Sequence, residues 1–184
     1  MSYLSYSKSF KGVADVFLRK PERYGPLLQF IETVMAAPSA LTKAEREIIA
    51  AHVSKMNGCG FCLGAHVATL AALDIDFHAL DATGSGPDTR NVSAKLQAIL
   101  EFATRITREP DSIRQADIDA LRDVGWEDET IEDAINVVAL FDYVNRLVDA
   151  FGIEGDDAYF KHVGATLATQ GYAPLVKSAL KKAG

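Results

Sequence analysis

The sequence predicts an all-α protein, and three observations support this. Apolar residues recur at spacings of three and four along nearly the whole chain, which is the period of an amphipathic helix. Residues that start or end helices stand at both sides of these segments. No stretch alternates apolar and polar side chains as a half-buried strand does. With 184 residues, the chain suits one helical domain, residues 1–184.

Three helices are expected in the first half of the chain, over residues 27–35, 42–56 and 59–73. The first lies between Pro21 and Pro38, which punctuate helices. The second begins where Thr42 and Glu45 fit a capping box, in which each side chain bonds the backbone of the other. It ends at Gly58, because glycine adopts the left-handed conformation that closes a helix. The third helix follows that break directly.

The second half has five expected helices, over residues 96–106, 117–124, 128–151, 159–167 and 175–182. Gly125 ends the short second one, and Gly152 ends the longest. The longest helix carries a broad apolar stripe from Ile135 to Phe151. On an otherwise apolar helix, a polar stripe predicts an exposed salt-bridged face or, alternatively, a pocket wall or a subunit contact; it consists of Asp142, Asn145, Arg146 and Asp149.

A loop over residues 83–88, rich in Gly and Ser, separates a motif-bearing half of about residues 20–82 from a scaffold half of about residues 90–184. The two halves could be related. Twelve positions separate Glu47 from Cys59, and the same number separates Asp133 from Asn145. Because the second half has no cysteine, a duplication would leave it as scaffold.

Charge and hydropathy exclude several classes of function. The net charge is −6, so the chain lacks the clustered Lys and Arg that bind nucleic acid or anionic membranes. Ten acidic and two basic residues lie within residues 109–133, which predicts a solvated helical face. No run of 18 apolar residues and no signal peptide is found, so we expect a cytoplasmic protein without a membrane span.

The informative segment contains Cys59, Cys62 and His66. At 3.6 residues per turn, these three positions fall within a stripe of about 60° on a helix. The thiolate is the reactive form of cysteine, and a helix N-terminus or a nearby imidazolium favours it. A thiolate oxidised by a peroxide can form a disulfide with a second thiol one turn away. The helix dipole favours Cys59 as the more acidic thiol, whereas Cys62 is the thiol one turn from His66.

Two other interpretations of these residues remain open. The cysteines could be buried structural residues at helical spacing. Alternatively, two thiols and His66 could bind zinc with Glu47 or His52 as a fourth ligand, although a second ligand pair at a distance is missing. By its position on the helix, His52 faces away from Glu47 and is expected to be structural or to face another subunit.

Glu47, twelve positions before a Cys-x-x-Cys-x-x-x-His motif, resembles the signature of the alkylhydroperoxidase AhpD-like proteins in the carboxymuconolactone decarboxylase superfamily. The motif here is Cys59-Gly60-Phe61-Cys62-Leu63-Gly64-Ala65-His66. Residues 41–47 and 56–59 also resemble the family. Residues 139–147, with the sequence ALFDYVNRL, resemble members described as peroxidase-related. The resemblance covers about residues 20–155.

This resemblance implies an all-helical antioxidant thiol peroxidase that acts on hydroperoxides without a bound cofactor or metal. By position, Cys62 would be the peroxidatic thiol and Cys59 the resolving thiol, and Glu47 and His66 would relay protons. A redox-active Cys59–Cys62 disulfide would then need an external dithiol or protein reductant. The family also implies a homo-oligomer, as a dimer, trimer or hexamer.

The sequence departs from the peroxidase pattern at Phe61, where characterised members have a second histidine. A phenyl ring cannot carry a proton, so slower peroxide turnover or a different substrate, such as a disulfide or an organic hydroperoxide, is expected. Two alternatives to the peroxidase are kept: a metal- or ligand-binding helical protein with structural thiols, and an enzyme similar to carboxymuconolactone decarboxylase. The decarboxylase branch lacks the cysteine pair, which makes it the weaker of these.

Overall fold

A computed structural model describes residues 2–77 and 93–183 of the chain. Within these ranges, the chain forms nine α-helices and no strand. The helices are α1 (Val13–Arg19), α2 (Pro21–Ala36), α3 (Lys43–Asn57), α4 (Gly60–Ala72), α5 (Ala94–Arg108), α6 (Gln115–Asp123), α7 (Asp128–Phe151), α8 (Asp157–Gln170) and α9 (Ala173–Ala183). Two short 3-10 helices, η1 (Ser5–Ser7) and η4 (Pro110–Ser112), complete them. The prediction of an all-α fold is confirmed.

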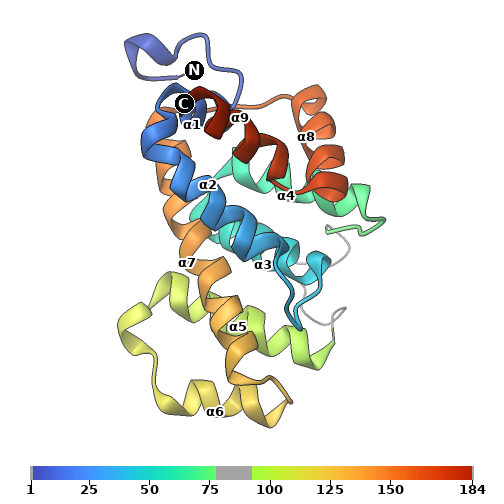
Figure 1. The fold of residues 1–184 in the computed structure, drawn as a ribbon. Helices are drawn as coiled ribbons and strands as arrows, with labels where there is room; N and C mark the ends of the chain where they lie inside the picture. The colour runs from blue at the N-terminus through green and yellow to red at the C-terminus, as the bar shows by residue number, and fades with distance from the viewer. Residues whose placement is uncertain (1, 78–92, 184) are drawn as a thin grey trace.

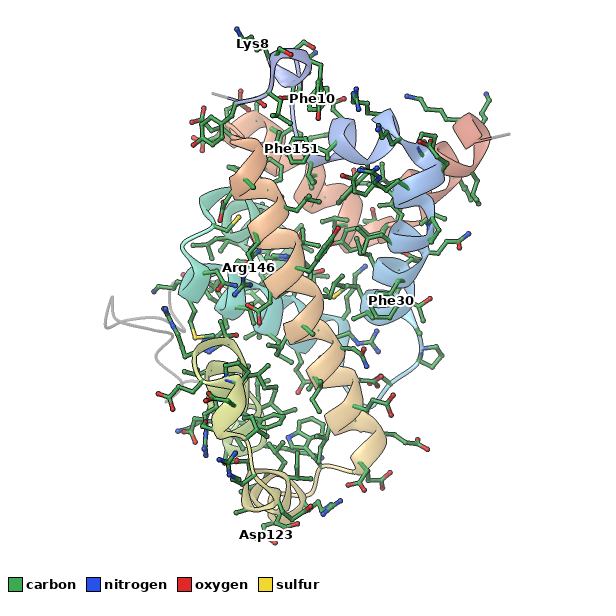
Figure 2. All side chains as sticks on the ribbon, turned by 90° about the vertical axis from the view of Figure 1, so that its left-hand side faces the viewer. Lys8, Phe10, Phe30, Asp123, Arg146 and Phe151 are labelled. Carbon is green, nitrogen blue, oxygen red and sulfur yellow. The ribbon has the colours of Figure 1, made fainter. Side chains whose placement is uncertain are left out.

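Helix α7 runs the length of the molecule and organises the other helices (Figure 1). Helices α5 and α6 pack at its beginning, while α1, α2, α8 and α9 gather toward its end (Figure 1). In Figure 2, Asp123 marks the end of the molecule formed by α5 and α6, and Phe151 lies at the opposite end near Phe10. Helix α3 packs along α7 and also contacts α4, which in turn packs against α8.

Most of the predicted helix boundaries agree with the structure to within a few residues. The capping box at the start of α3 is present, with Thr42 accepting from the Glu45 backbone and Glu45 accepting from the Thr42 backbone. Gly58 and Gly152 adopt the left-handed conformation, with φ of 72° and 65°, and end α3 and α7. The predicted loop over residues 83–88 lies outside the described residues.

Two features of the fold differ from the sequence prediction. Helix α1 was not predicted, because Asp15 and Arg19 interrupt its short apolar pattern, yet it buries Val16 and Phe17. Ile135 was expected on the buried stripe of α7 but is 37% exposed. The early turns of α7 have fewer helices around them, so the buried face there is narrower than the apolar stripe.

A single apolar core joins the helices that carry the cysteine motif to those that follow it. Helix α4 and helix α8 cross closely at Gly164, where an added Cβ would lie 2.5 Å from the backbone of Ala68. Ordinary side chains cannot approach to that distance, so this crossing needs glycine. Among the described residues, no helix combines the length and apolar character needed to cross a bilayer.

Candidate active site

The site is built on the tight connection between α3 and α4. Gly58 ends α3, and the backbone N–H of Cys59 donates to the carbonyl of Ser54 at 3.0 Å. Cys59 is the N-cap of α4, and its own carbonyl accepts from the N–H of Leu63. The chain therefore reverses within three residues, which brings the first turns of α4 against α3.

This reversal joins Glu47 of α3 to His66 of α4. The Nδ1 of His66 lies 2.7 Å from the Glu47 Oε2, and both side chains are nearly fully buried. A carboxylate can only accept, so Nδ1 donates this hydrogen bond, and in the neutral imidazole the lone pair is then on Nε2. The imidazole also packs edge-on against Phe141, with ring centroids 4.3 Å apart. Glu47 is thus a buried partner of His66 and not a solvated surface acid.

Both cysteines are buried and are not joined by a disulfide. The Cys62 side chain and burial, with a weaker effect of Asp149, raise the pKa of the Cys59 thiol well above its usual range. These effects act against the helix dipole, which favoured an acidic Cys59 in the sequence argument.

A cavity of about 380 Å³ lies next to Cys62. Cys62 and His66 contribute to its wall, whereas Cys59 and Glu47 do not among the described residues. The wall is otherwise mostly apolar and comes from α1, α2, α4, α7, α8 and α9, with side chains such as Phe17, Ile31, Phe61, Phe141, Val144 and Leu167. A ligand in the cavity can therefore contact the Cys62 thiol, whereas the Cys59 thiol is not part of the cavity wall.

Three polar residues of the cavity were not singled out from the sequence as site residues. Tyr159 and His162 come from α8, and Tyr172 comes from the turn between α8 and α9. Burial raises the pKa of Tyr159 to about 12, and the negative charges of Asp15 and Cys62 add to this effect. These residues lie about a hundred positions after the motif, so no spacing rule connects them to it.

Phe61, which replaces the expected second histidine, lies in an aromatic cluster. Its ring centroid is 5.4 Å from that of Tyr159 and 5.7 Å from that of Phe160. Gly64 leaves room for Phe160, because an added Cβ would lie 2.8 Å from its ring. The phenyl ring therefore makes the cavity wall apolar at the position next to Cys62.

The residues considered for zinc are not arranged as a metal site. Within the described ranges, no group of three or more His, Cys, Asp or Glu side chains could hold a metal ion. His52 lies apart from the cysteines and bonds Thr104 at 2.8 Å through Nε2, as its predicted structural role requires. Burial lowers the pKa of His52 to about 4, so its imidazole is neutral at physiological pH.

The polar residues of α7 support the connection between α3 and α4. Asn145 is fully buried and donates to Ser54 Oγ, while the Asn57 amide donates to Asn145 and Asp142. Arg146 pairs with Asp142 on the exposed side of the helix, visible midway along α7 in Figure 2. The Asp142–Arg146 pair thus forms the salt-bridged exposed face predicted for this helix, whereas Asn145 is buried and holds the residues just before Cys59.

Comparisons with known proteins agree with this geometry. Residues 21–76 match the model of the carboxymuconolactone decarboxylase family. A search of curated proteins finds no match. Among solved structures, the chain is similar to an uncharacterized peroxidase-related protein from Silicibacter sp. TM1040, with 29% identity, a TM-score of 0.72, and coverage of 80% of this chain and 78% of that one. It also has the fold of an alkylhydroperoxidase AhpD core protein from Ralstonia eutropha JMP134, with 24% identity, a TM-score of 0.71, and coverage of 82% and 78%.

The fold and the placement of the cysteine motif at the start of α4 define an all-α protein of the AhpD-like class. The family match over residues 21–76 and the similarity to the peroxidase-related structure from Silicibacter support the alkylhydroperoxidase AhpD-like and carboxymuconolactone decarboxylase superfamily. This agrees with the family indicated by the Glu47 and Cys-x-x-Cys-x-x-x-His spacing.

Proposed function

We propose that the protein is a two-thiol peroxidase that reduces organic hydroperoxides, with Cys62 as the peroxidatic residue. The observation that carries this proposal is the buried Glu47–His66 pair next to a thiol that faces an apolar cavity. Such an arrangement supplies a nucleophile, a base and a site that excludes water. The family adds support, because its members include enzymes and the first structure above is described as peroxidase-related.

In the first step, His66 accepts the thiol proton of Cys62 at Nε2, and Glu47 stabilises the resulting imidazolium. The thiolate attacks the terminal oxygen of the hydroperoxide. A sulfur–oxygen bond forms while the oxygen–oxygen bond breaks, so the sulfur loses two electrons and the peroxide gains them. The leaving alkoxide takes the proton from His66 and departs as an alcohol. Cys62 is left as a sulfenic acid.

In the second step, the Cys59 sulfur attacks the sulfenic sulfur and forms the Cys59–Cys62 disulfide, while the Cys59 proton leaves with the sulfenic hydroxyl as water. The two cysteines lie three positions apart at the start of α4, which places them for this reaction. Because the Cys62 side chain and burial raise the pKa of Cys59, this thiol must lose its proton as it attacks. An external dithiol or protein reductant then restores both thiols by disulfide exchange. No other cofactor is required.

The cavity favours an organic hydroperoxide over hydrogen peroxide as substrate. Its walls are aromatic and aliphatic, and its volume of about 380 Å³ exceeds what a molecule of two oxygen atoms needs. An apolar substituent on the peroxide would gain from burial there. The aromatic cluster around Phe61 contributes to this preference.

Two cysteine variants test the proposal. We expect C62S to lose peroxide consumption, because a hydroxyl does not react with peroxides. C59S is the matched control. It should reduce one equivalent of cumene hydroperoxide and then stop, with a sulfenic acid that dimedone traps at Cys62 and mass spectrometry detects.

In the reduced wild-type protein, thiol titration should give two thiols, and none after one equivalent of peroxide. Full peroxide turnover by C62S would overturn the proposal. Activity of C62S toward a lactone or small acid would instead support chemistry like that of the decarboxylase.

A further inference from the structure

Tyr172 lies in the turn between α8 and α9, and this turn is fixed to α2. The backbone N–H of Tyr172 donates to the Glu32 carboxylate at 2.7 Å. Gly171 before it has φ of 61°, which is the left-handed region that favours glycine, and an added Cβ would lie 3.1 Å from the same carboxylate. These contacts hold the turn in place against α2. They therefore also fix the direction of the Tyr172 side chain.

The Tyr172 side chain forms part of the cavity wall together with Cys62 and His66. Burial first, and then the negative charges of Glu47, Cys62 and Glu32, raise the pKa of Tyr172 well above its usual value. The phenol therefore stays protonated whenever Cys62 reacts, and it serves as a hydrogen-bond donor and not as a base.

Tyr159, the other phenol in the cavity wall, is placed differently. Its hydroxyl lies against Gly12, where an added Cβ would be 2.1 Å away, and it feels the charge of Asp15 as well as that of Cys62. Tyr172 instead feels the charge of Glu47, the partner of His66. The Tyr159 hydroxyl therefore lies against a residue outside the cavity wall, which favours Tyr172 as the phenol that faces the substrate.

We propose that Tyr172 is a further catalytic residue, whose hydroxyl donates a hydrogen bond to the leaving oxygen of the hydroperoxide as Cys62 attacks. This inference rests on the proposed peroxidase function. In the attack, charge moves from sulfur onto the alkoxide oxygen as the oxygen–oxygen bond breaks. Tyr172 stabilises that charge and keeps its own proton, while the imidazolium of His66 supplies the proton that makes the alcohol.

Glu32 is a positioning residue in this arrangement, because it holds the turn that carries Tyr172 and does not line the cavity among the described residues. Removal of its carboxylate frees the Tyr172 backbone N–H and loosens the turn. The phenol would then reach the substrate less often, although its hydroxyl is still present.

The test is single-turnover oxidation of Cys62, measured in wild type and Y172F with two oxidants. With tert-butyl hydroperoxide, the leaving group is an alkoxide, and we expect the rate to fall about 100-fold or more, as it does when one donor to a developing oxyanion is removed. With peracetic acid, the leaving carboxylate is a weak base that needs little stabilisation. The rate for Y172F should then stay within about twofold of wild type.

Two further measurements separate this role from a structural one. Alkylation of Cys62 by iodoacetamide breaks no oxygen–oxygen bond, so Y172F should react as fast as wild type. The Y143F control removes a hydroxyl that is half exposed on the outer face of α7 and should match wild type with both oxidants. E32A should show a smaller loss than Y172F, again confined to the hydroperoxide.

An equal loss with both oxidants, or slower alkylation, would show that Tyr172 acts on the thiol or the fold and would overturn the inference. Unchanged hydroperoxide reduction by Y172F would overturn it as well, while the peroxidase itself stands. If the wild-type protein does not oxidise Cys62 with tert-butyl hydroperoxide, the proposed function fails first. Far-UV circular dichroism of each variant checks that α8 and α9 remain folded.

Discussion

Glu47 holds the proton of His66 on one particular nitrogen. Its carboxylate is buried and accepts from Nδ1, so in the neutral imidazole the lone pair is on Nε2, the nitrogen available for proton transfer. At the scale of single residues, this pair sets which atom can act as the base.

His52 provides a second residue-scale effect, on stability and not on chemistry. Its Nε2 bonds Thr104, while its Nδ1 has no hydrogen-bond partner among the described residues. Burial lowers its pKa from 6.5 to about 4. Between these pH values, the unfolded chain binds a proton at His52 and the folded chain does not, so a fall in pH favours unfolding.

We therefore predict that the free energy of unfolding falls by about 3 kcal/mol between pH 7 and pH 4 through His52 alone. H52Q keeps a donor for Thr104 but does not titrate, so it should lose this part of the pH dependence. Urea unfolding of both proteins at several pH values measures the difference. An H52Q profile parallel to that of wild type would contradict the prediction.

The residues of the site differ in how far the sequence could predict them. Glu47, Cys59, Cys62 and His66 lie within twenty positions on two consecutive helices, so helical spacing was enough to bring them together. Tyr172 comes to the same cavity through tertiary packing of α9 and its turn, which no local pattern encodes. The raised pKa of Cys59 likewise comes from the Cys62 side chain and from burial, and the helix-dipole argument took neither into account.

At the scale of elements, the crossing of α4 and α8 keeps the cavity closed on one side. Gly164 permits this contact, because an added Cβ would meet the backbone of Ala68. We predict that G164A destabilises the protein by about 1–3 kcal/mol, since one helix must move away from the other. Thermal unfolding measures this loss.

Gly60 offers a matched control on α4, because an added Cβ there has no neighbour within 4 Å. G60A should change stability by less than about 0.5 kcal/mol. A G164A melting temperature equal to that of G60A would show that the two helices can separate at no cost.

Strong local signals explain which elements were predicted well. The capping box at Thr42 and the left-handed Gly152 mark helix ends by their own chemistry, so α3 and α7 were placed closely. Helix α1 has only seven residues and no capping side chain, and it is stabilised mainly by packing on α2 and α9. Isolated helices of that length are unstable, which is why its sequence gives little indication of it.

At the scale of the whole molecule, the cavity joins helices from both ends of the chain. Val13 and Ala14 of α1 lie in the same wall as Leu175 and Ser178 of α9. If the cavity binds the substrate, as we propose, residues far in sequence from the thiols would limit its size. The predicted homo-oligomer, by contrast, remains a prediction.

We predict that A14F, which fills part of the cavity, lowers kcat/KM for cumene hydroperoxide about tenfold and that for hydrogen peroxide by less than about twofold. The control A139F places the same ring on the exposed face of α7 and should change neither value. Steady-state peroxide assays measure both. An equal fall for both peroxides with A14F would indicate that the cavity does not select the substrate.

The two parts of the site are completed at different stages of synthesis. The Glu47–His66 pair and both thiols are present once residue 66 has left the ribosome, whereas the cavity also needs Tyr172 and Leu175. Contacts between distant parts of a chain form later than local ones. A growing chain would therefore carry its reactive thiols before the wall that restricts their access, and its last two helices would protect Cys62 from unselective oxidation.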